Sequence, residues 1–136
     1  MPNHFHFLVF TLENHRGNDL NKAIGILLRS YTRAINLQEN RTGSLFQQKT
    51  KAKSLTGFPN EYPQICFDYI HQNPLKAGLV NKMEDWEFSS FRDYMGIRNG
   101  SLPDYEMTEK FIDYNKSTFY KEAYGEINEE KIKMIF

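Results

Sequence analysis

Residues 4–10 most constrain the fold, because two histidines, His4 and His6, stand two residues apart in a run that is otherwise apolar or aromatic. Such a run predicts a β-strand, in which successive side chains point to opposite faces of a sheet. His4 and His6 then share one face, and Phe5 and Phe7 take the other. The shared face would let both imidazoles bind one metal ion. The alternative is that they are hydrogen-bonded residues on a sheet surface.

The rest of the chain predicts a mixture of helices and strands. Apolar residues at three- and four-residue steps predict a helix over about residues 19–37. Residues 45–55 predict a second strand, and residues 61–73 predict a second helix that Pro74 stops. Gly78 follows in a turn that uses a positive φ. Residues 96–103 predict a linker, and the acidic remainder predicts short helices broken near Gly125.

Length and composition indicate one globular domain of a cytoplasmic protein. The chain has 136 residues and a hydrophobic share of 40%, which is enough for a core. Its single cysteine, Cys66, excludes an internal disulfide and a thiolate zinc site. No apolar run reaches membrane-spanning length and no secretory leader is recognisable, so the sequence predicts no membrane partner.

The formal net charge is zero, but the charge is unevenly distributed. Residues 1–83 carry 10 Lys and Arg against 5 Asp and Glu, whereas residues 84–136 carry 7 against 12. The basic excess is greatest between residues 29 and 53, which predicts contact with nucleic-acid phosphates. The alternation of three lysines in the second predicted strand is equally typical of an edge protected against aggregation. The predicted DNA-binding residues are Arg29, Arg33, Arg41, Lys49, Lys51 and Lys53.

Tyr69 and Asn73 lie four residues apart in the second predicted helix, which places a phenol and an amide on one face. Four runs, taken in order, resemble the REP-associated tyrosine transposases, a branch of the single-tyrosine HUH transposases. They are the His-x-His strand, RTGSLFQ at residues 41–47, YIHQNPLKAGLV at residues 69–80 and WEFSSFRDY at residues 86–94. Together they cover roughly residues 2–96, so the resemblance extends over most of the chain.

The resemblance implies a fold and a domain division. The expected fold is α+β, a ferredoxin-like antiparallel sheet with helices on one face, over residues 1–96. An acidic, mostly helical extension is expected over residues 97–136. In these transposases a strand, a helix and a further strand precede the His-x-His strand. The start at Met1 therefore predicts a longer reading frame or a shortened gene copy, and a chain that is marginal alone or forms a homodimer.

The resemblance also implies a mechanism. Tyr69 would be the nucleophile, and His4, His6 and Asn73 would hold Mg²⁺ or Mn²⁺. The substrate would be single-stranded or hairpin DNA, joined to the tyrosine through its 5′ phosphate while a 3′ hydroxyl is released. His71 and Asp68 are expected to be surface or packing residues, and Gln72 is the nearest substitute ligand.

Two other interpretations of the same residues remain open. Under the first, the chain would be an inactive DNA-binding remnant of such a transposase; under the second, it would be a divalent-metal phosphodiesterase in which water attacks instead of Tyr69.

Overall fold

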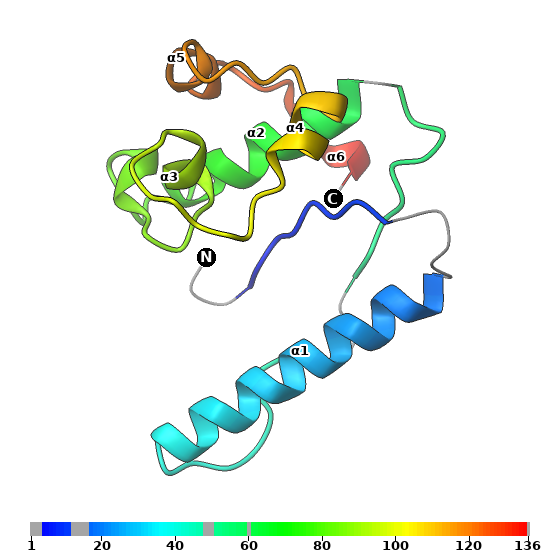
Figure 1. The fold of residues 1–136 in the computed structure, drawn as a ribbon, viewed down its shortest axis with the longest axis vertical. Helices are drawn as coiled ribbons and strands as arrows, with labels where there is room; N and C mark the ends of the chain where they lie inside the picture. The colour runs from blue at the N-terminus through cyan, green and yellow to red at the C-terminus, as the bar shows by residue number, and fades with distance from the viewer. Residues whose placement is uncertain (1–3, 12–16, 48–50, 60, 136) are drawn as a thin grey trace. The chain divides into compact units, whose positions relative to one another are not determined.

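The computed structural model describes residues 4–11, 17–47, 51–59 and 61–135. Its contacts divide the chain into two compact units: unit 1 comprises Met1–Leu8 with Ser54–Phe136, and unit 2 comprises Val9–Lys53. Every regular element of the described residues is a helix (Figure 1). The elements are α1 (Gly17–Gln38), α2 (Glu61–Lys76), η1 (Met83–Asp85), α3 (Phe91–Tyr94), α4 (Tyr105–Phe111), α5 (Phe119–Ala123) and α6 (Glu129–Ile135).

Unit 2 is built on α1, the helix predicted from its apolar periodicity. Asp19 stands in the first turn, where a negative charge interacts favourably with the helix dipole. The helix ends where Asn40 takes a positive φ of 47° and the Arg41 amide donates to the Asn36 carbonyl at 3.0 Å. The chain then turns back along the helix (Figure 1).

Unit 1 is organised around α2, and the Phe67 side chain of this helix is buried in the main core. The core combines Phe67 with side chains from η1, α3 and α5 and from the segment after α4, and the short C-terminal helices α5 and α6 contact α2 (Figure 1). The buried core residues are Phe67, Met83, Phe91, Tyr94, Ile112, Phe119 and Ala123. The predicted boundary at residue 96 therefore falls inside unit 1, because residues on both sides of it share one core.

Pro74 does not stop α2 as expected. The helix continues to Lys76 with Pro74 buried inside it, so the Ile70 carbonyl lacks the proline N–H that would normally pair with it. Gly78 ends the helix at a φ of +68°, as predicted. The Leu79 amide donates to the Pro74 carbonyl at 3.0 Å and the Gly78 amide to the Leu75 carbonyl at 2.9 Å, which is the Schellman pattern.

The segment predicted as a linker is fixed to α3. Arg98 holds the buried Asp93 carboxylate through Nε at 2.8 Å and Nη2 at 2.5 Å, and the Gly100 amide donates to the same carboxylate at 2.8 Å. A Cβ on Gly100 would lie 2.6 Å from Asp93 Oδ1, so only glycine lets the backbone approach this closely. The Arg98 guanidinium holds the pKa of the Asp93 carboxyl below its usual range.

The expected α+β fold is wrong, because no strand and no sheet occur among the described residues. Residues 4–11 and 51–55 are irregular in structure. An alternating side-chain pattern is local, whereas a strand also needs a second extended segment to accept and donate its backbone hydrogen bonds. Within the described ranges, neither predicted strand has such a ladder. None of the helices described here combines the length and apolarity needed to cross a membrane.

Candidate functional site

The N-terminal segment of unit 1 brings the two predicted histidine ligands together. The His4 and His6 ring centres lie 4.9 Å apart with their planes at 84°. The Phe5 and Phe7 rings form a separate pair at 5.0 Å. Side chains two residues apart therefore lie together, as in an extended chain, although the segment belongs to no sheet.

Tyr69, the predicted nucleophile, projects from α2 towards this pair. Its ring and that of His6 meet edge to face, with the ring centres 5.7 Å apart and the planes at 76°. Tyr69 itself is half-buried. Residues more than 60 positions apart in the sequence are thus neighbours within unit 1.

Asn73, the predicted amide ligand, follows Tyr69 by one turn of α2. Its side chain is only 9% exposed. Its amide nitrogen Nδ2 is buried and has no hydrogen-bond partner in the described part of the chain. An unsatisfied buried donor is costly, so this nitrogen is a candidate to donate to an external acceptor, whereas a metal ion would bind the amide oxygen.

The electrostatics suit a neutral imidazole at His6. Burial lowers the pKa of His6, and the neighbouring His4 lowers it further. The neutral ring keeps a lone pair, which is the form that binds a metal ion.

The spacing of the two imidazoles fits shared coordination. Two imidazoles that bind one ion at metal–nitrogen distances of about 2.1 Å have ring centres roughly 4.6 to 5.3 Å apart. The observed 4.9 Å lies in that range. No third His, Cys, Asp or Glu joins this pair within the described ranges, so a third protein ligand would have to be of another type, such as the Asn73 amide.

The neighbours of Tyr69 on α2 hold the helix in place. His71 is fully buried among aromatic rings, and its Nε2 lies 2.9 Å from Ser90 Oγ. Gln72 Nε2 donates to the Ala123 and Gly125 carbonyls at 2.7 and 2.8 Å. These two residues are packing residues, so Gln72 is committed to the backbone and does not substitute as a ligand. Asp68 is half-buried, and burial raises its pKa even though it accepts hydrogen bonds from Gln64.

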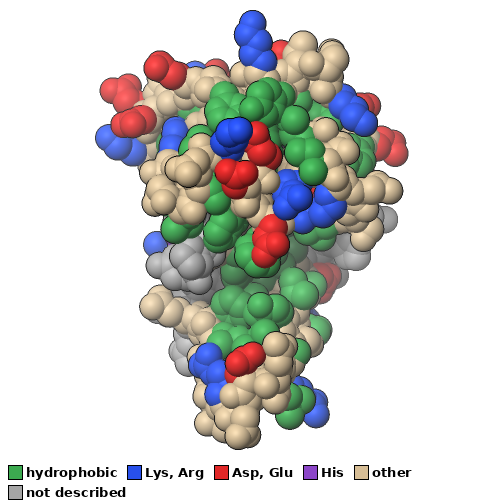
Figure 2. All heavy atoms as spheres, turned by 90° about the vertical axis from the view of Figure 1, so that its left-hand side faces the viewer, with side chains coloured by type: hydrophobic (Ala, Val, Ile, Leu, Met, Phe, Trp, Pro, Cys, Tyr) green, Lys and Arg blue, Asp and Glu red, His purple; other side chains and the backbone are tan. Residues whose placement is uncertain are grey.

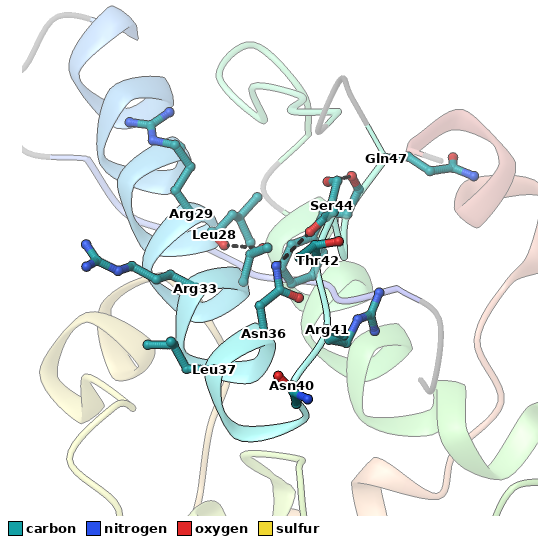
Figure 3. A pocket seen from close by; sticks show the side chains of 14 residues that line it. Leu28, Arg29, Arg33, Asn36, Leu37, Asn40, Arg41, Thr42, Ser44 and Gln47 are labelled. Carbon is teal, nitrogen blue, oxygen red and sulfur yellow. Dashed lines mark hydrogen bonds between the residues drawn. The ribbon is translucent and has the colours of Figure 1, made fainter.

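Three of the predicted DNA-binding residues lie together in unit 2. Arg29, Arg33 and Arg41 line a hollow between α1 and residues 39–47 (Figure 3). Lys51 and Lys53 are exposed in an irregular segment, so the predicted row of lysines along a strand is absent where the chain is described. Lys49 lies outside the described residues.

Sequence reasoning missed the polar residues that line this hollow beside the arginines, chiefly Asn36, Thr42 and Ser44. Asn36 lies near the end of α1, and Thr42 and Ser44 lie in the turn-forming segment that follows the helix.

Comparisons of the chain with protein-family models, curated proteins and solved structures give no match.

Proposed function

We propose that the protein is a metal-dependent transposase that nicks and joins single-stranded or hairpin DNA, with Tyr69 as its nucleophile. The observation that carries this proposal is the contact between the Tyr69 and His6 rings, at 5.7 Å, with His4 beside them. The resemblance to REP-associated tyrosine transposases gives the same residues the same roles. Under the proposal the protein acts in the cytoplasm, with DNA as its partner and with two copies of the chain able to pair.

The proposed reaction exchanges one phosphate ester for another. Tyr69 Oη forms a bond to phosphorus, and the bond from phosphorus to the 3′ oxygen breaks. The tyrosine loses its proton and the departing 3′ oxygen gains one, so no water and no energy source are consumed. The DNA end stays attached as a 5′-phosphotyrosine, and a 3′ hydroxyl can reverse the step to join strands.

The chain supports this chemistry by holding Tyr69 on a rigid element. Phe67 and His71 fix α2 in the core from one side, and Gln72 ties the helix to the α5 end through two hydrogen bonds. A nucleophile on a packed helix keeps its position without a further ordering step. Mg²⁺ or Mn²⁺ held by His4, His6 and Asn73 would place positive charge beside the non-bridging phosphate oxygens.

The first prediction tests the nucleophile. A pool of randomised single-stranded oligonucleotides, incubated with the protein and Mn²⁺, should yield a denaturant-resistant protein–DNA adduct. Tyr69→Phe should abolish the adduct, since it removes only the attacking oxygen, and should leave binding of Mn²⁺ and DNA nearly unchanged. Denaturing gels with 5′- and 3′-labelled DNA measure the adduct and show which end is attached.

The matched control is Tyr120→Phe, which changes a phenol on α5 that hydrogen-bonds to Glu84. It should form the adduct as the unmodified chain does. His4→Ala and His6→Ala should each weaken Mn²⁺ binding by at least about tenfold, and Asn73→Ala should weaken it less, because water replaces an amide oxygen more easily. An adduct that survives Tyr69→Phe, or nicking that leaves no adduct, would contradict the proposal; the second result would indicate hydrolysis by water.

A further inference from the structure

Unit 2 contains a hollow of about 880 Å³ between α1 and residues 39–47 (Figure 3). Its size is in the range of ligand sites, which is roughly 300 to 1,000 Å³. Leu28, Leu37 and Phe46 contribute apolar surface, and the arginines and several amide and hydroxyl groups contribute polar surface. An aromatic or aliphatic surface bordered by guanidinium groups suits a ligand that has both a flat ring and a phosphate.

The charged residues that line the hollow within the described part of the chain are three arginines. In the view of Figure 3, Arg29 and Arg33 project one turn apart from the side of α1 away from the loop, and Arg41 comes from the loop. No Asp or Glu of the described residues lines the hollow, and the nearest acidic residue in the sequence is Glu39, next to Asn40. The three guanidinium groups make no ion pair within the described ranges, so their charge is not neutralised there. Guanidinium groups bind phosphate through two donors at once, which makes them well suited to this role.

The loop that closes the hollow is held in shape by its own hydrogen bonds. Asn36 Nδ2 donates to the Gly43 carbonyl at 2.8 Å, and Ser44 Oγ donates to the Phe46 carbonyl at 2.6 Å. Phe46 packs 6.0 Å from Tyr31 of α1. Asn36 Oδ1 is buried and accepts no hydrogen bond from the described residues. An acceptor beside an apolar surface can pair with an N–H group on the edge of a base, such as N3–H of thymine.

Gly25 contributes to the same site from within α1. A glycine inside a helix is destabilising relative to alanine, so its presence calls for a local reason. A Cβ on Gly25 would lie 3.3 Å from Arg29 Nη1. The missing side chain gives the Arg29 guanidinium room to lie against the helix at the hollow.

We infer that this hollow binds an unpaired nucleotide within a DNA strand, with the arginines on its phosphates and Leu28 and Phe46 against its base. The inference rests on the proposed function, because it assigns part of the same DNA substrate to unit 2. An acidic polypeptide would satisfy the charge but would make no use of the ring surface or of the Asn36 acceptor.

The test measures binding of fluorescein-labelled oligothymidylate to the full chain by fluorescence anisotropy. Arg29→Ala, Arg33→Ala and Arg41→Ala should each weaken binding about fivefold or more at low salt. Each should also reduce the slope of log affinity against log salt by about 0.7, the value for one lost phosphate contact. Phe46→Leu keeps apolar volume but removes the ring, and should weaken binding about fivefold.

Lys22→Ala is the matched control, because it removes one positive charge from the same helix outside the hollow. It should change affinity less than about twofold. A loss equal to that of the arginine variants, or arginine variants that bind as the unmodified chain does, would overturn the inference. Displacement at concentrations as low as those of unlabelled oligothymidylate would overturn the inference: thymidine 5′-monophosphate acting so would assign the hollow to a free nucleotide, and polyglutamate acting so would assign it to an acidic polypeptide.

Tyr69→Phe separates this inference from the proposed function. It should bind oligothymidylate as the unmodified chain does and form no adduct. Binding that depends on the arginines, without any adduct from the unmodified chain, would contradict the transposase proposal alone. An adduct that forms equally well without the three arginines would contradict the nucleotide site alone.

Discussion

His71 makes the stability of the fold depend on pH. Full burial lowers its pKa to about 3 from the usual 6.5 of a histidine, so the folded protein keeps the ring neutral. The unfolded chain binds a proton at His71 below pH 6.5, where the folded chain does not. Because the unfolded state then holds more protons, stability falls as the pH is lowered through this window.

The resulting prediction is a loss of about 2 kcal/mol from His71 between pH 7 and pH 5, at about 1.4 kcal/mol for each pH unit below the unfolded pKa. Urea unfolding at several pH values measures it. His71→Gln cannot titrate and should remove most of this dependence. His6→Gln should remove a smaller share, because the His6 pKa is also lowered but the ring is only partly buried. A His71→Gln variant with the original pH dependence would contradict this account.

At the level of single residues, the sequence predicted that His4 and His6 lie side by side but not how deeply His71 is buried. The two-residue step between His4 and His6 and the four-residue step between Tyr69 and Asn73 are local geometry, and both were readable. That Tyr69 meets His6 depends on a contact between distant segments, which only the resemblance indicated. The burial of His71 could not be predicted, because it depends on rings supplied by α3 and α5.

At the level of elements, helices were predictable and strands were not. The apolar steps of α1 and the glycine that ends α2 act within a few residues, so sequence alone identified them. Pro74 was misjudged, since a proline near the end of a helix removes one hydrogen bond while the surrounding core still holds the helix. The predicted strands failed because pairing with a second segment is not a local property.

Gly25 gives a prediction for α1. Gly25→Ala should stabilise the helix by about 0.5 to 1 kcal/mol, because alanine loses less backbone entropy on folding. The new methyl group meets only the flexible end of Arg29, which can move aside. Ala23→Gly makes the reverse change at an exposed position of the same helix. It should destabilise the helix by a similar amount. Thermal unfolding followed by far-ultraviolet circular dichroism measures both changes.

The same substitution should carry a functional penalty if Arg29 contacts phosphate. Gly25→Ala displaces the guanidinium from its place beside the helix, so affinity for oligothymidylate should fall while stability rises. Stability and binding that rise together would show that Gly25 has no role at the hollow.

At the scale of the whole molecule, the acidic end of the chain is part of a folded unit rather than a tail. Residues 104–135 supply α4, α5 and α6, and the Lys131 ammonium pairs with Glu61 of α2 at 2.7 Å. On the face drawn in Figure 2, Lys and Arg side chains lie among Asp and Glu side chains. The charge imbalance along the sequence therefore does not divide unit 1 into a basic body and an acidic appendage. A linear count could not show this, because Ile112 and Phe119 reach the core only through folding.

The last prediction follows from that shared core. Phe119 is 4% exposed and packs against Phe67 and Phe91. Phe119→Ala should lower the free energy of unfolding by about 3 to 5 kcal/mol, because it leaves a cavity where a large ring was buried. Lys121→Ala, at an exposed position of the same helix, should change it by less than about 0.5 kcal/mol.

A chain shortened to residues 1–103 should lose cooperative unfolding altogether, because it removes Ile112, Phe119 and Ala123 from the core at once. Domain stabilities of about 5 to 15 kcal/mol leave little margin for such a loss. Urea unfolding followed by tyrosine and tryptophan fluorescence compares Phe119→Ala, Lys121→Ala and the shortened chain with the unmodified protein. If the shortened chain unfolds as cooperatively as the full one, residues 104–135 are an independent extension. The shared core would then not be needed to hold α2 and Tyr69 in place.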